Sequence, residues 1–100
     1  MSVTWVTLLE VAPGPDPDYF PPDVKGGFVK VVAVAVEEAE VANLVDDYLG
    51  GLMEIRETLY CDRLSDRPDL QADGDVVGSL EKLTDVRRVA WGPIYSFENE

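Results

Sequence analysis

The chain has 100 residues, enough for one domain with a modest core, and 46% of them are hydrophobic, as in ordinary globular proteins. Twenty acidic residues against eight basic ones give a net charge of −12, which disfavours binding to DNA, RNA or anionic membranes. The single cysteine excludes an intramolecular disulfide. The longest strongly apolar run, residues 31–36, is too short to cross a bilayer, and the N-terminus does not resemble a secretion signal, so we expect a cytoplasmic protein.

Two strands are predicted in the first third of the chain, separated by a proline-rich loop. Residues 3–11 alternate regularly and are rich in β-branched and aromatic side chains, which is typical of a strand. Residues 12–27 contain five of the seven prolines and therefore favour neither a helix nor a central strand. Residues 28–36 are apolar on both faces apart from Lys30, which predicts a central strand.

A helix and a third strand are predicted next. Residues 37–49 place apolar side chains at helical spacing, and Gly50 and Gly51 supply a C-terminal stop. Residues 52–62 return to alternation, which predicts a half-buried strand with one wet face. Glu57 falls on the otherwise apolar side of that strand and weakens the middle of the pattern.

The last third of the chain predicts a polar loop, a short helix and a final strand. Residues 63–75 form the loop, and residues 76–84 the helix, with Asp75 as its cap. Residues 86–97 predict the strand, and Gly92-Pro93 should bulge it and favour an edge position.

These elements predict a single α+β domain over residues 1–100, with the proline-rich loop at 12–27. The segment 28–62 is a β-α-β unit, which normally joins parallel strands. The natural assembly is a two-layer sandwich with a four-stranded sheet and one or two helices on one face. It resembles a ferredoxin-like fold in architecture, although the order of elements differs from βαββαβ.

No catalytic, metal or cofactor signature is found. The chain has no histidine, which removes the commonest general base and transition-metal ligand. Cys61 falls on the apolar side of its strand and is expected to be inert. The stretch Asp69–Asp75 resembles the start of a calcium loop, but its twelfth position falls on Leu80, so we reject an EF-hand and leave open only a weak, irregular cation site. We therefore expect a non-enzymatic protein with no cofactor.

Two features are candidate protein-binding sites. Tyr19 and Phe20 lie within the proline-rich loop and could anchor an interface, or could fold back onto the core. The predicted helix carries five acids and no base, which would attract a basic partner or would simply be solvated. These acids are Glu37, Glu38, Glu40, Asp46 and Asp47.

The leading hypothesis is a small acidic protein-binding module, of inhibitor or immunity type, that acts on a basic protein partner. The alternative is a dimeric small-molecule-binding or regulatory domain, in which the last strand lines a pocket or a homodimer interface with Trp91, Tyr95 and Phe97 on one face. A small enzyme ranks third. The acidity could also reflect solubility, or a salt-adapted or GC-rich source.

Overall fold

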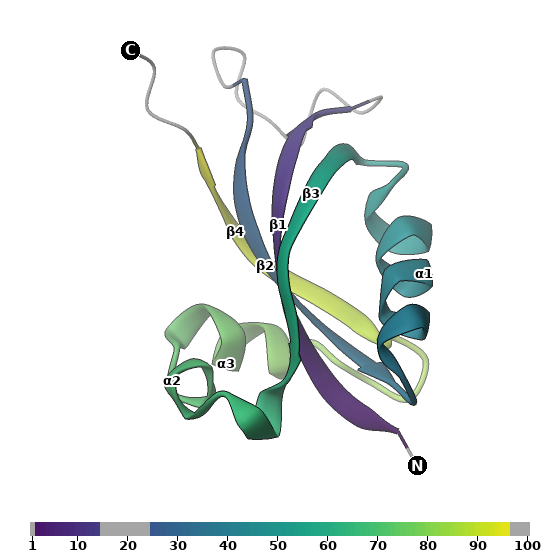
Figure 1. The fold of residues 1–100 in the computed structure, drawn as a ribbon, viewed down its shortest axis with the longest axis vertical. Coiled ribbons are helices and arrows are strands. Elements are labelled where there is room, and N and C mark those ends of the chain that lie inside the picture. The colour runs from purple at the N-terminus through teal and green to yellow at the C-terminus, as the bar shows by residue number, and fades with distance from the viewer. Residues whose placement is uncertain (1, 15–24, 97–100) are drawn as a thin grey trace.

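Four strands form a single antiparallel sheet in the order β3-β1-β2-β4 (Figure 1). The computed structural model describes residues 2–14 and 25–96. The α+β class and the four-stranded sheet predicted from the sequence are confirmed. The elements are β1 (Val3–Pro13), β2 (Gly27–Ala35), α1 (Glu38–Leu49), β3 (Met53–Arg63), the 3-10 turn η2 (Leu64–Asp66), α2 (Pro68–Gln71), α3 (Gly74–Leu80) and β4 (Val89–Ser96).

The parallel crossover predicted for residues 28–62 is present in a split form. β2 and β3 each pair with β1 in the antiparallel sense, so they run parallel to each other with β1 between them. Such a split β-α-β unit also occurs in ferredoxin-like folds. The chain order differs from theirs, because here two paired strands precede the first helix.

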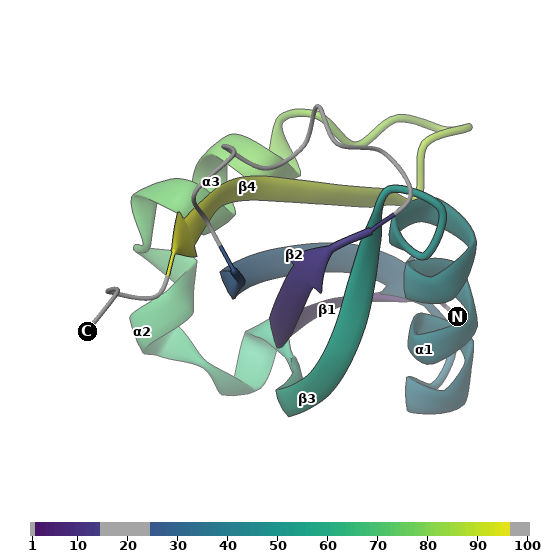
Figure 2. The same cartoon turned by 90° about the horizontal axis from the view of Figure 1, so that it is seen from above.

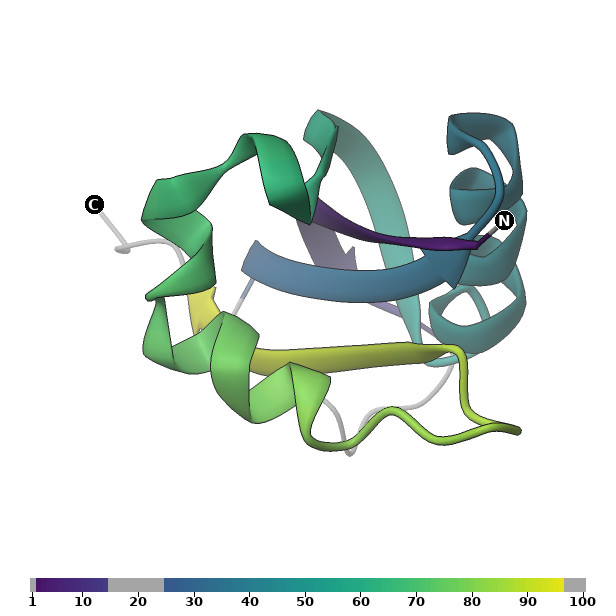
Figure 3. The same ribbon diagram turned by 90° about the horizontal axis from the view of Figure 1, so that it is seen from below.

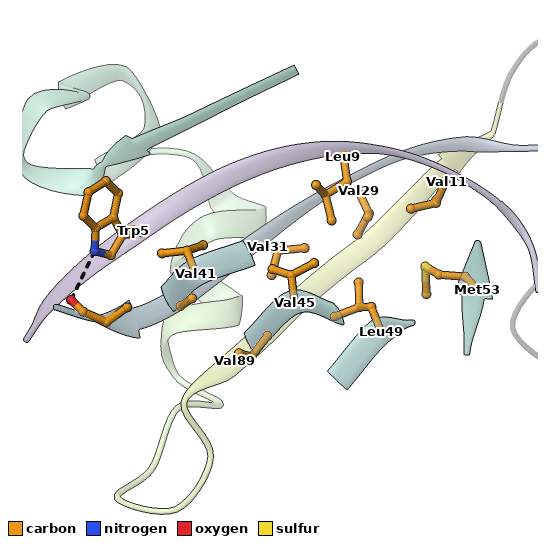
Figure 4. Packing of buried hydrophobic residues seen from close by; sticks show 12 residues of the cluster. Trp5, Leu9, Val11, Val29, Val31, Val41, Val45, Leu49, Met53 and Val89 are labelled. Atoms are coloured by element: carbon orange, nitrogen blue, oxygen red, sulfur yellow. Dashed lines mark hydrogen bonds between the residues drawn. The ribbon is translucent and has the colours of Figure 1, made fainter. Parts of the chain in front are cut away.

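One face of the sheet is covered by α1. Alternate residues of a strand point to opposite faces, and the odd-numbered residues of β2 meet the apolar stripe of the helix. Figure 4 shows this packing, together with the indole of Trp5, which donates a hydrogen bond to the carbonyl oxygen of Ala35 at 3.1 Å. The buried residues of this core are Trp5, Leu9, Val11, Val29, Val31, Ala33, Ala35, Val41, Val45, Leu49, Met53 and Val89.

The opposite face of the sheet is partly covered by α2 and α3, which add a layer beyond the single helical layer that the sequence predicts. Val6 and Val32 point to this face and pack with Leu70 of α2 and Val76 of α3. Figures 2 and 3 show α1 on one side of the sheet and the two shorter helices on the other. A strand that is apolar on both faces, as β2 is, is therefore covered on both faces.

The prediction that residues 63–75 form a polar loop without helices is wrong. This segment contains η2, α2 and the start of α3, which runs over Gly74–Leu80 rather than 76–84. The cap of α3 is Asp73 and not Asp75, since the Asp73 carboxylate accepts hydrogen bonds from the backbone N–H groups of Asp75 and Val76. These helices are too short to show an apolar period that sequence inspection would recognise.

Bulges in the two edge strands decide where several side chains point. In β3, Arg56 and Leu59 are extra residues opposite β1, since Glu57 pairs with Glu10 whereas Ile55 pairs with Val11. Glu57 therefore points away from the face of Ile55, which resolves its apparent conflict with the apolar pattern. In β4, the predicted bulge at Gly92-Pro93 and the edge position are both confirmed.

Candidate functional site

The solvent side of α1 carries four exposed acids. Glu37, Glu38, Asp46 and Asp47 are exposed, and their side chains make no hydrogen bond or ion pair with any other residue in the described ranges. We call these four residues the acidic surface of α1. The position of Asp46 and Asp47 follows from the helical period, because the buried residues Val41, Val45 and Leu49 recur every four residues and leave these two acids outside. Glu37 and Glu38 lie at the start of the helix, where Glu37 is the N-cap.

Glu40, the fifth acid predicted as a binding residue, is not part of the acidic surface, because its side chain is ion-paired. Its carboxylate accepts a hydrogen bond from the guanidinium of Arg88, which lies just before β4. That hydrogen bond holds the pKa of Glu40 below its ordinary value. Glu40 therefore ties α1 to the chain entering β4 and is not free for an external partner.

Within residues 2–14 and 25–96, no ion pair neutralises the acidic surface of α1. α1 has no basic residue in its last turn, where Asp46 and Asp47 oppose the helix dipole. The basic residues that form ion pairs do so with other acids: Lys30 pairs with Asp73, Arg56 with Glu54, Arg67 with Asp62 and Asp69, and Arg88 with Glu40. The negative potential of this helix face therefore remains available to an approaching cation.

A groove of about 390 Å³ runs between α1 and β3, beside the acidic surface. Its lining is mainly apolar or small, with one carboxylate at Glu38. This groove was not predicted from the sequence, in which the placement of Ala39 and Ala42 outside the apolar stripe of the helix was a signal for it. The lining residues are Glu38, Ala39, Ala42, Thr58, Tyr60 and Cys61.

Cys61 is a half-buried residue in the lining of this groove and is poorly suited to nucleophilic chemistry. Burial, together with the negative charges of Glu38 and Asp62, raises the pKa of its thiol to about 11. The thiol is therefore protonated at neutral pH and acts as an apolar lining group. This supports the prediction of an inert cysteine.

The structure does not bring the residues of the alternative site together. Trp91 pairs with Val31 and packs against the α1 core, whereas Tyr95 pairs with Phe28 on the opposite face, because the bulge at Gly92-Pro93 reverses the alternation. The prediction that they share one face is wrong. Phe97, like Tyr19 and Phe20 of the proline-rich loop, lies outside the described residues.

The acids of the rejected calcium loop have partners within the protein. Asp69 accepts hydrogen bonds from Arg67, Asp73 caps α3 and binds Lys30, and Asp75 accepts one from the hydroxyl of Tyr95. Within residues 2–14 and 25–96, no group of three histidine, cysteine or acidic side chains could hold a metal ion. The weak cation site left open by the sequence therefore has no support in this segment.

Comparisons with known proteins add no relative. A scan of protein-family models, a search of curated proteins and a search of solved structures each returned no match. The fold and the site thus define the protein only as an acidic α+β domain with a charged helical surface. No helix among the described residues combines the length and the apolar character that crossing a bilayer requires.

Proposed function

We propose that this protein is a non-enzymatic, cytoplasmic protein-binding module that acts on a basic protein partner through the acidic surface of α1. The observation that carries the proposal is the pair Asp46 and Asp47. Both are exposed, neither has a partner in the described part of the chain, and both lie in the helical turn where a negative charge is least favourable.

Stability alone gives no reason for such an arrangement. A carboxylate in the last turn of a helix typically costs up to about 1 kcal/mol, and the last turn of α1 holds no basic residue that would offset this cost. A basic partner would reverse the balance, because opposite charges across an interface favour association and set its orientation. The charge of −12 would also speed the encounter with such a partner.

Affinity capture from a native lysate at low salt tests the proposal. The protein is immobilised, the bound fraction is eluted with a salt gradient, and the fractions are identified by mass spectrometry. We expect one basic protein to elute sharply at moderate salt, since charge contacts weaken as salt screens them. An empty or diffuse elution would contradict the proposal.

The alternative, a dimeric small-molecule-binding domain, has less support. Its candidate residues do not form one surface, because Trp91 and Tyr95 point to opposite sides of the sheet. A second cavity of about 420 Å³, between the start of β1 and the shorter helices, gathers no charged group. Its lining residues are Thr4, Leu64, Ser65, Gln71 and Leu80.

A further inference from the structure

The flank of α1 that faces β3 has a regular arrangement of charge and small residues. Glu38, Ala42 and Asp46 are each four residues apart, so they lie in one row along the helix. Glu38 and Ala42 line the groove, and Asp46 continues their row by one turn. The row therefore presents an alanine between two exposed carboxylates.

The other flank of α1 lacks this arrangement. Glu40 lies there and is occupied by Arg88, which also donates to the carbonyl oxygen of Val34. Asp47 projects on this side of the helix, about a third of a turn from Asp46. The groove and the free carboxylates thus coincide only on the β3 side.

The chemistry of the groove selects one kind of occupant. Its apolar wall of Ala39, Ala42 and the thiol of Cys61 favours methylene groups, whereas Glu38 favours a positive charge and repels an anion. Lysine and arginine side chains combine the two properties, because they lay an aliphatic stem on apolar surface and keep a charged end at its rim.

We propose that the groove between α1 and β3 receives a lysine or arginine side chain of the partner, with its stem against Ala39 and Ala42 and its cationic end at Glu38. This inference rests on the proposed function and specifies where on the protein the basic partner makes contact. A second cation of the partner binds Asp46. Eight residues of helix separate the two acids, so the partner's cations are roughly 12 Å apart, or about four residues along an extended segment.

The test uses octalysine as the probe and the full chain labelled with ¹⁵N. At low salt, we expect saturable shifts of backbone amide signals that concentrate at residues 38–46 and 58–61. Glu38→Gln removes the charge at the groove, and Ala42→Leu fills the groove with a good helix former. Each should weaken octalysine binding about three- to fivefold, the range of a partly exposed charge contact.

Two matched variants serve as controls. Glu81→Gln removes one charge at an exposed acid outside the acidic surface of α1, and Asn43→Leu adds the same apolar side chain at an exposed position of α1 that does not line the groove. Both should change the affinity for octalysine by less than about twofold. Circular dichroism of each variant checks that the fold is kept.

The outcomes separate this inference from the proposed function. Asp47→Asn, a change elsewhere in the acidic surface, serves as a comparison: if it weakens octalysine binding as much as Glu38→Gln does, and Ala42→Leu has no effect, the groove is overturned as the site but a diffuse acidic binding surface remains. Absence of saturable octalysine binding at low salt would contradict both. Selective loss in Glu38→Gln and Ala42→Leu supports the groove.

Discussion

Lys30 and Asp73 connect the centre of the sheet to the start of α3. The ammonium group of Lys30, in β2, donates to Oδ2 of Asp73 at 2.6 Å, while Oδ1 of the same carboxylate accepts from the backbone N–H groups of Asp75 and Val76. One side chain thus satisfies both the helix terminus and the only charged residue of β2. The hydrogen bond from Lys30 lowers the pKa of Asp73, and the same contact raises the pKa of Lys30.

Asp73 should be one of the acids that matters most for folding. Asp73→Ala loses both the cap and the ion pair, and we expect unfolding by urea to show a loss of about 1–2 kcal/mol. Asp73→Asn keeps an oxygen that can cap the helix and should lose about half as much or less. Equal losses in the two variants would mean that the cap contributes nothing.

The contribution of Asp73 should disappear in acid. Its pKa is lower in the folded protein than its ordinary value of 3.8, so the folded state binds this proton less readily than the unfolded state. The stabilisation is therefore present above pH 3.8 and is lost as the pH falls through the lower, folded value. Urea titrations at a series of pH values should show the gap between wild type and Asp73→Asn closing below pH 3.8. A gap that widens in acid would contradict this assignment.

Charge removal at the two ends of α1 should have opposite effects on stability. Asp47→Asn removes a charge that opposes the helix dipole and should stabilise the protein by about 0.3–1 kcal/mol. Glu38→Gln removes an equal charge from the first turn, where the dipole favours it, and should bring no such gain. Chemical denaturation at low salt measures both. Destabilisation by Asp47→Asn would reveal a structural role and weaken the argument for a binding role.

Two glycines should respond differently to the same substitution. A Cβ on Gly27 would lie 2.5 Å from the carbonyl oxygen of Tyr95 in the neighbouring strand, so Gly27→Ala must shift one strand and should cost about 1–3 kcal/mol. A Cβ on Gly78, within α3, meets nothing within 4 Å, and Gly78→Ala should stabilise by about 0.5–1 kcal/mol. Melting temperatures provide the comparison, and a stabilising Gly27→Ala would show that β2 and β4 are less closely paired than described.

Sequence patterns sufficed for the long elements of this fold. The strands β1, β2 and β3 and the helix α1 each span nine or more residues, so alternation or helical spacing repeats often enough to be recognised. The bulge at Gly92-Pro93 was also predictable, because proline cannot donate in a sheet ladder. Its consequence for Tyr95 was not, since the number of extra residues at a bulge depends on the pairing with β2.

The short helices and the groove required three-dimensional information. α2 has four residues and α3 has seven, and both are fixed by long-range contacts such as Lys30 with Asp73. The acidic surface of α1 was predictable as a row of acids. That Glu40, unlike Asp46 and Asp47, has a partner among the described residues depends on Arg88, which is 48 residues away from Glu40 in the chain.

The most direct test of the central claim compares two neutralised proteins in the same lysate capture. One carries Glu37→Gln, Glu38→Gln, Asp46→Asn and Asp47→Asn. The other carries amides at four exposed acids elsewhere: Glu57, Asp66, Glu81 and Asp85. Both lose four negative charges, so net charge cannot distinguish them. We predict that the first loses the basic partner and the second retains it with a similar salt elution. Equal retention or equal loss would contradict a binding role for the acidic surface of α1.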